Sequence, residues 1–185
     1  MVAEFFSTAF FVFLCCGAAG VNPGNTVAIS LSFGFVILAL LHVTGPISGG
    51  HINPAVSLAL ATFKYVSWTK CAAYVLAQFL GAIVGALVLF VVMPEDQYGC
   101  LGANMLNSEL MHEGGERFTY NAGRAFLLEA MTTLVFMLVV FSTVSETGNV
   151  AHGLGPFPIA MRCALPTCAP RAPYRRLHPR GYSDI

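Results

Sequence analysis

Charged residues are scarce in this sequence of 185 residues. Asp, Glu, Lys and Arg together make up 10% of it, and nine basic and nine acidic side chains leave a formal net charge of zero. Soluble domains carry about 25% charged residues, so this chain lacks the polar surface that a water-soluble protein needs. The absence of net positive charge also argues against nucleic acid as a partner.

The sequence also lacks the patterns that catalysis and metal binding require. The six cysteines, at positions 15, 16, 71, 100, 163 and 168, follow no metal-ligand spacing. No acid–base pair and no nucleophile with a neighbouring base emerges. We therefore predict that the protein is not an enzyme and has no metal site and no cofactor.

Hydrophobic residues are abundant instead, at 56% of the chain, with a mean hydropathy of +0.72. Four apolar stretches, over residues 4–21, 26–43, 70–93 and 122–145, are each close to the ~20 residues that cross a ~30 Å hydrocarbon core. The first stretch has no basic start and carries Glu4, so we interpret it as a transmembrane helix rather than a signal peptide. Together the four stretches predict an all-α, multi-pass membrane protein.

Two features indicate how these helices are arranged. The third stretch carries Ala77, Gly81 and Gly85 at four-residue spacing, which favours close helix packing in lipid. The segment after it, 94–121, is acidic, whereas the segment before it carries Lys64 and Lys70 and no acid. The positive-inside rule places the lysines, and with them the N-terminus, on the cytoplasmic side.

The segment SGGHINPAVSLAL (48–60) interrupts the apolar pattern between the second and third stretches. Asn53 is a favoured N-cap and Pro54 suits the first helical turn, so a helix is predicted over 54–63. Ten residues span ~15 Å, half a membrane. An ordinary capped loop is the alternative, but the flanking spans favour a re-entrant half-helix. Irregular backbone before it is tolerated at membrane depth where it lines a watery cavity.

The nine residues SGGHINPAV resemble the first signature loop of the aquaporin (major intrinsic protein) family. The likeness runs from about residue 2 to 159 and includes AEFFST, YVLAQFLGAIVGA and LLEAMTTLVF; CLGAN and GLGPFPI are similar to plant plasma-membrane-type members. The resemblance implies a bundle of six tilted helices and two half-helices, water as permeant and the plasma membrane as location. It also implies a homotetramer, or a hetero-oligomer with family members.

The resemblance assigns roles to individual residues. It implies a pore signature loop formed by Gly49, Gly50, His51, Asn53, Pro54 and Ala55, in which Asn53 is the first of two pore asparagines. Phe33, twenty residues before Asn53, matches the aromatic position of the outer selectivity filter. Phenylalanine at this position resembles water-selective members, whereas glycerol facilitators tend to have tryptophan.

A repeated pattern points to residues that support the loops. Glu4 and Thr8 open the first span with the same Glu-x-x-x-Thr pattern that Glu129 and Thr133 form 125 residues later. A carboxylate in lipid is costly and needs partners. The resemblance implies that both glutamates bond signature-loop backbone and that Gln78 supports the first loop.

The sequence departs from the family after residue 160, where the chain becomes rich in arginine and proline. No lipid-facing span can be built from such a segment. We expect a partial aquaporin-like domain over 1–160, with four transmembrane helices and one half-helix. Residues 161–185 are expected to be a disordered tail, and the second half of the inverted repeat is expected to be lost. A shifted reading frame, alternative splicing and an error in the gene model remain alternative explanations.

Three functions are compatible with these patterns. The first is a passive water channel whose chain is incomplete and conducts poorly alone. The second is a facilitator of small neutral solutes such as glycerol, against which Phe33 argues. The third is a non-conducting subunit that assembles with full-length relatives and modulates them.

Overall fold

The computed structural model describes residues 1–22, 25–94, 110–111, 117–118, 122–144 and 156–164. Its helices are α1 (Val2–Val21), α2 (Thr26–Ser48), α3 (Pro54–Thr62), α4 (Trp68–Val92), α5 (Ala122–Val144) and α6 (Phe157–Ala164). The helices α1, α2, α4 and α5 are long and apolar enough to cross a membrane. The predicted all-α membrane class is confirmed. Strands β1 (Leu110–Met111) and β2 (Arg117–Phe118) add a two-residue antiparallel ladder outside the helices.

The predicted end of the second span, residue 43, is wrong, because α2 continues to Ser48. Pro46 lies inside this last part of the helix, where its missing N–H removes one backbone hydrogen bond without ending the helix. The helix ends instead at Gly49, which adopts a left-handed φ of 94° and donates its N–H to the carbonyl of Gly45. The other three spans begin and end within two residues of the predicted positions.

The short helix α3 begins and ends at defined caps. The Asn53 side chain accepts a hydrogen bond from the N–H of Ala55 at 2.9 Å, and Pro54 occupies the first turn. At the far end, Lys64 takes a left-handed φ of 67° and donates its N–H to the carbonyl of Ala61. Nine residues span ~14 Å, so α3 is a half-length helix, as predicted.

The helices α1 and α4 pack backbone to backbone through two glycines. A Cβ added at Gly81 would lie 2.2 Å from the carbonyl oxygen of Phe5, and one at Gly85 would lie 2.3 Å from that of Ala9. Both glycines are buried. The small-residue spacing in the third span therefore does mark a close helix contact, as predicted from the sequence.

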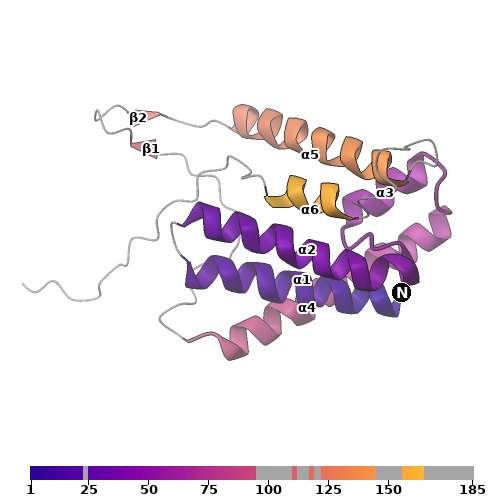
Figure 1. The fold of residues 1–185 in the computed structure, drawn as a ribbon, viewed down its shortest axis with the longest axis horizontal. Helices are drawn as coiled ribbons and strands as arrows, with labels where there is room; N and C mark the ends of the chain where they lie inside the picture. The colour runs from indigo at the N-terminus through magenta and orange to yellow at the C-terminus, as the bar shows by residue number, and fades with distance from the viewer. Residues whose placement is uncertain (23–24, 95–109, 112–116, 119–121, 145–155, 165–185) are drawn as a thin grey trace, which may run out of the picture.

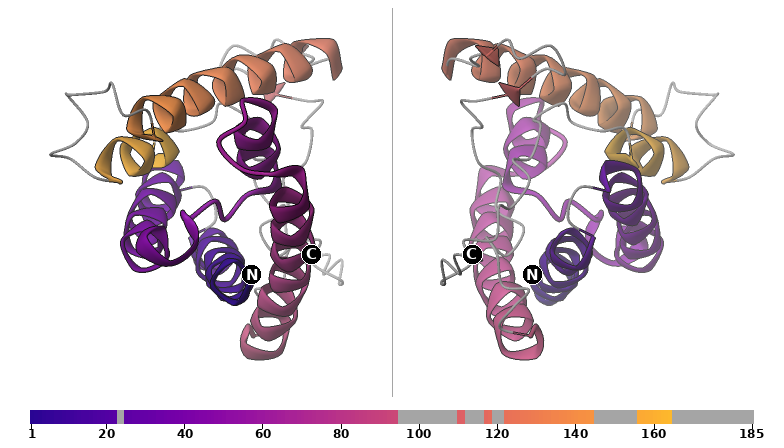
Figure 2. Two further views of the ribbon diagram at one scale, coloured as in Figure 1. Left: turned by 90° about the vertical axis from the view of Figure 1, so that its right-hand side faces the viewer. Right: turned by 90° about the vertical axis from the view of Figure 1, so that its left-hand side faces the viewer.

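The helices surround the connection between α2 and α3. In Figure 1, α6 lies between α2 and α5, and the end-on views of Figure 2 show the chain crossing from the end of α2 to the start of α3 in the middle of the bundle. Ile52 of this connection is buried with Ile37 and Leu41 of α2 and Ala160 of α6.

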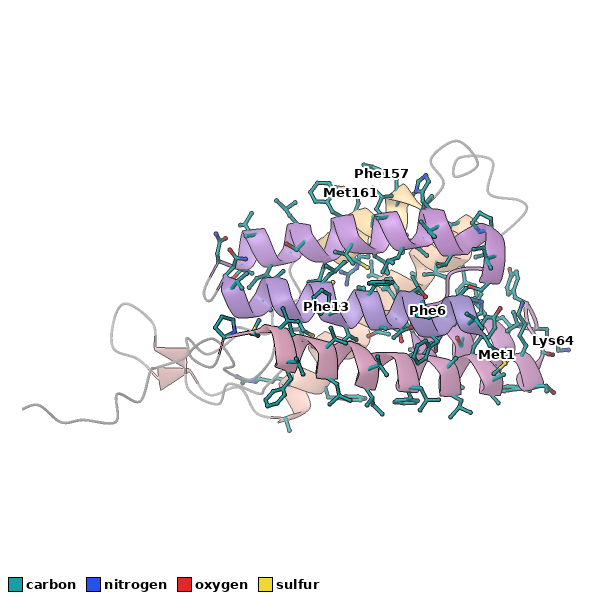
Figure 3. The ribbon with its side chains drawn as sticks, turned by 90° about the horizontal axis from the view of Figure 1, so that it is seen from below. Met1, Phe6, Phe13, Lys64, Phe157 and Met161 are labelled. Atoms are coloured by element: carbon teal, nitrogen blue, oxygen red, sulfur yellow. The ribbon has the colours of Figure 1, made fainter. Side chains whose placement is uncertain are left out.

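The helix α6 runs across residue 160, where the sequence places a domain boundary. The guanidinium of Arg162 donates to the carbonyl oxygen of Thr132 on α5 at 2.8 Å. Phe157 and Met161 are exposed on the outside of α6 (Figure 3). Residues 165–185 lie outside the described residues.

Candidate functional site

The carboxyl group of Glu4 holds the connection between α2 and α3. Glu4 lies in the first turn of α1 and has 0% of its surface exposed. Its Oε1 accepts hydrogen bonds from the N–H of His51 at 3.0 Å and the hydroxyl of Ser48 at 2.5 Å. Its Oε2 accepts from the N–H of Ile52 at 2.8 Å and from the Gln78 amide at 2.8 Å. Four donors thus satisfy a carboxyl group that would otherwise be very costly to bury.

The connection held by Glu4 has an unusual backbone. Gly49, Gly50 and Ile52 have φ of 94°, 63° and 54°. This left-handed region is open to glycine but unfavourable for a β-branched side chain, at a cost of about 1–3 kcal/mol. Ile52 is held there from both sides, because its N–H binds Glu4 and its carbonyl accepts the Thr8 hydroxyl at 3.3 Å.

The side chains of Gln78, Ser57 and His51 continue the network away from Glu4. The amide nitrogen of Gln78 lies 3.1 Å from Oγ of Ser57, and that oxygen lies 2.9 Å from Nδ1 of His51. Ser57 and Gln78 are almost completely buried, and His51 is buried too. The three residues come from α3, α4 and the connection before α3, so the network joins these elements.

Tyr74 of α4 fixes the same segment from another side. Its hydroxyl donates to the carbonyl of Ser48 at 2.9 Å. Its ring meets the imidazole of His51 edge-on, with centroids 5.1 Å apart and planes at 80°. The imidazole is therefore restrained by an aromatic contact as well as by its hydrogen bond to Ser57.

The predicted signature residues lie together around α3. Asn53 is exposed at the start of α3; its Oδ1 caps the helix, while its amide nitrogen makes no hydrogen bond within the described residues. Pro54 and Ala55 form the first turn. Gly50 is buried, and an added Cβ there would lie 2.8 Å from Leu41. Among the described residues, no donor bonds the carbonyls of Gly49, Gly50 or His51.

Other predicted residues lie apart from this network. Phe33 of α2 packs edge-on against Phe11 of α1, and fifteen residues of helix, ~22 Å, separate it from Ser48. Glu129 and Thr133 are exposed on α5. In the described part of the chain, no three His, Cys, Asp or Glu side chains are grouped as metal ligands would be.

Sequence reasoning missed Ser48, Ser57 and Tyr74, which complete the network. Each is a polar residue close to or within an apolar stretch, and in a membrane protein such residues need partners. The sequence could therefore have indicated that these residues need hydrogen-bond partners, but which partners they have depends on how the helices pack.

Known proteins are similar to this chain in sequence and in fold. The family model described as "Major intrinsic protein" matches residues 1–171. The lens fiber major intrinsic protein of Ovis aries is 37% identical over 150 residues, which are 80% of this chain and 53% of that protein. Aquaporin-4 of Homo sapiens is 34% identical over 174 residues, 87% of this chain and 50% of that protein. The chain thus spans about half the length of the curated relatives it matches.

A solved structure supports the fold. The aquaglyceroporin from Plasmodium falciparum superposes with a TM-score of 0.69 at 22% identity, covering 90% of this chain and 68% of that one. At this identity the likeness concerns the fold alone. Together with the family model, which matches most of the sequence, these findings establish that the chain belongs to the major intrinsic protein family.

Proposed function

We propose that this chain supplies the first signature loop of a passive water pore. The observation that carries the proposal is the connection held by Glu4, which crosses the middle of the bundle and leads into the half-helix capped by Asn53 (Figure 2). A backbone with left-handed residues is kept in one conformation by two N–H bonds to a buried carboxyl group. Such preorganisation suits a binding surface for a small permeant better than it suits a plain linker.

The polar groups of this loop match the chemistry of water. The amide nitrogen of Asn53 is a donor at the positive end of the α3 dipole, so it favours a water oxygen and disfavours a cation. The carbonyls of Gly49, Gly50 and His51 are acceptors for water hydrogens. Donors and acceptors on one short segment allow water to bind without a charged side chain.

Phe33 supports water over glycerol as the permeant. Its edge-on contact with Phe11 fixes the ring between α1 and α2. Phenylalanine at this position resembles water-selective members of the family, whereas glycerol facilitators tend to have tryptophan there. A glycerol-type facilitator is the alternative that solute measurements test.

The exposed polar residues of α5 suggest that the chain conducts poorly alone. Glu129 and Thr133 are exposed on a membrane-length helix that is the least buried of the four. A carboxyl group facing lipid is unfavourable, so another protein segment is needed to cover it. We propose a homotetramer or a hetero-oligomer with family members. The same observation favours the second candidate, a non-conducting subunit that modulates full-length channels.

We further propose the plasma membrane as location, with a cytoplasmic N-terminus. Lys64 is exposed at the end of the bundle that also holds Met1 (Figure 3). Lys70 is exposed in the first turn of α4, which follows directly. Lysines at the ends of transmembrane segments favour the cytoplasmic side.

Osmotic swelling of liposomes that contain the full chain tests these proposals. Asn53→Asp keeps the helix cap but removes the amide donor, and Asn25→Asp is the matched control because Asn25 caps α2 in the same way. We expect swelling slightly faster than that of empty liposomes, with glycerol excluded, lost in Asn53→Asp and retained in Asn25→Asp. Glycerol entry would contradict the water assignment.

Two further outcomes decide the remaining points. Fast swelling of the isolated chain would contradict the need for partners. No swelling, with insertion shown by protease protection, would favour the non-conducting subunit. Acceleration or slowing of a co-reconstituted family member would then measure its effect.

A further inference from the structure

The direction of the hydrogen bond between Glu4 and Gln78 follows from the geometry. Oε2 of Glu4 accepts the backbone N–H of Ile52, a group that can act as a donor alone. The same oxygen lies 2.8 Å from the Gln78 amide, so the amide presents its nitrogen and not its oxygen. This orientation of Gln78 leaves its Oε1 buried without a hydrogen-bond partner among the described residues, but the reverse orientation would set that oxygen against Oε2 of Glu4.

The second hydrogen of that amide determines the role of Ser57. It points to Oγ of Ser57 at 3.1 Å, so this oxygen is an acceptor toward Gln78. The hydroxyl still has one hydrogen of its own to donate. Nδ1 of His51, at 2.9 Å, is the acceptor within reach of that hydrogen among the described residues.

The opposite tautomer of His51 would leave a further buried group, the Ser57 hydroxyl, unsatisfied. If Nδ1 carried the proton, both His51 and Gln78 would donate to Ser57, and the hydroxyl hydrogen would have no acceptor. Ser57 has 0% of its surface exposed, so water cannot supply one from the bulk solvent. An unsatisfied buried donor is unfavourable, and the arrangement with a donating hydroxyl avoids it.

We infer that Ser57 is a positioning residue that holds the neutral imidazole of His51 in the tautomer with its proton on Nε2. Gln78 donates to Glu4 and to Ser57, and Ser57 donates to Nδ1 of His51, so the carboxyl group of Glu4 sets the direction of the whole series. The loop thereby acquires a fixed N–H donor at Nε2. A Cβ added at Gly49 would lie 3.4 Å from Nε2 and from Cδ2, so this edge of the ring lies over the Gly49 backbone.

The consequence for permeation rests on the proposed function. An N–H at Nε2 binds a water oxygen and disfavours a cation, whereas a bare nitrogen would accept a proton or bind a metal ion. Together with the Asn53 amide, it gives the loop two side-chain donors beside its carbonyl acceptors. Ser57 would thus help to determine which permeants the loop accepts, without touching them itself.

Nitrogen-15 NMR of histidine in the full chain, reconstituted in lipid bilayers at neutral pH, tests the inference. The sequence contains five histidines, so His51→Asn identifies the signals of His51 by their loss. In the unsubstituted protein we expect an unprotonated Nδ1 and a protonated Nε2. A protonated Nδ1 would overturn the inference, whatever the variants show.

Variants of Ser57 show whether this residue sets the tautomer. In Ser57→Ala we expect the Nδ1 signal to move and the two tautomers to mix, while Ser57→Thr, which keeps a hydroxyl, restores the original pattern. Ser142→Ala, on α5, removes a hydroxyl bonded to its own helix and should leave the His51 signals unchanged. A Ser57→Ala spectrum identical to the original would overturn the inference.

The NMR prediction and the swelling prediction can fail independently of each other. The tautomer is read from the imidazole whether or not the chain conducts. If the NMR prediction holds and swelling is absent, the isolated chain forms no water pore, the non-conducting subunit is favoured, and the role of Ser57 stands. If swelling occurs and Nδ1 is protonated, the water pore stands and the positioning role of Ser57 is wrong.

Discussion

The amide nitrogen of Gln78 lies 2.8 Å from Oε2 of Glu4, although 74 positions separate the two residues in the chain. Both side chains are buried, at 1% and 0% exposure. The pair joins α1 to α4 directly beneath the loop that precedes α3. The stability of the loop should therefore depend on side chains that lie far from it in sequence.

Replacing Glu4 by Gln should destabilise the protein strongly. The new amide would turn an N–H toward the donors of His51 and Ile52, and at least one of them would lose its acceptor. We expect the free energy of unfolding to fall by about 3 kcal/mol, as for a broken buried charged hydrogen bond. Thermal unfolding in detergent measures the effect. Glu129→Gln, at an exposed site, is the control, and equal loss in the two variants would refute the anchoring role of Glu4.

Replacing Gly81 by Ala should separate α1 from α4. The added methyl group would lie 2.2 Å from the backbone of Phe5, which cannot move without shifting the helix. A loss of about 1–3 kcal/mol is expected from such overpacking. The matched variant Gly45→Ala adds a methyl group inside α2 with nothing within 4 Å, and should be neutral or slightly stabilising. Unfolding by denaturant compares the two, and similar stabilities would contradict the packing.

Replacing Thr8 by Val should loosen the loop without removing bulk. The variant loses the hydroxyl that holds the carbonyl of Ile52 in its left-handed conformation. We expect a loss of about 1 kcal/mol and faster hydrogen exchange at the amides of His51 and Ile52. Thr62→Val removes an exposed hydroxyl bonded within α3, so it serves as the control. Unchanged exchange in Thr8→Val would show that Glu4 alone holds the strained residue.

Replacing Tyr74 by Phe should weaken the contact between α4 and the end of α2. The ring stays against His51, but the carbonyl of Ser48 loses its donor. The expected loss is about 1 kcal/mol, visible as increased protease cleavage near residue 48. Tyr65→Phe, whose ring is half-exposed beside Phe141, should behave like the unsubstituted protein. Cleavage that rises equally in both variants would exclude a specific role for the Tyr74 hydroxyl.

The sequence predicts the spans and the half-helix because hydropathy and capping are local properties. Asn53 and Pro54 predict the start of α3 whatever other elements surround it. The end of α2 was not predictable in this way, since Pro46 is tolerated in its last turns and Gly49 provides the true stop.

The hydrogen-bond network is a different case, because its partners come from separate elements. The resemblance to the family suggested Glu4, Thr8 and Gln78 as loop-supporting residues, and the structure places all three around the loop. Ser57 and His51 are close in sequence, but their contact depends on the backbone between them, where Ile52 has a left-handed conformation that its side chain disfavours. These contacts depend on the crossing of α1, α3 and α4, which local patterns do not encode.

The glycine contacts between α1 and α4 also affect the distance between the side chains of Glu4 and Gln78. Phe5 follows Glu4 directly, and Gly81 lies one turn after Gln78, so the carboxyl and amide groups sit beside the tightest point of the helix pair. Because Gly81 and Gly85 have no side chain, α1 and α4 can approach closely enough for the Gln78 amide to reach the Glu4 carboxyl group. The hydrogen bonds that hold the loop before α3 thus depend on two glycines that do not contact the loop through a side chain.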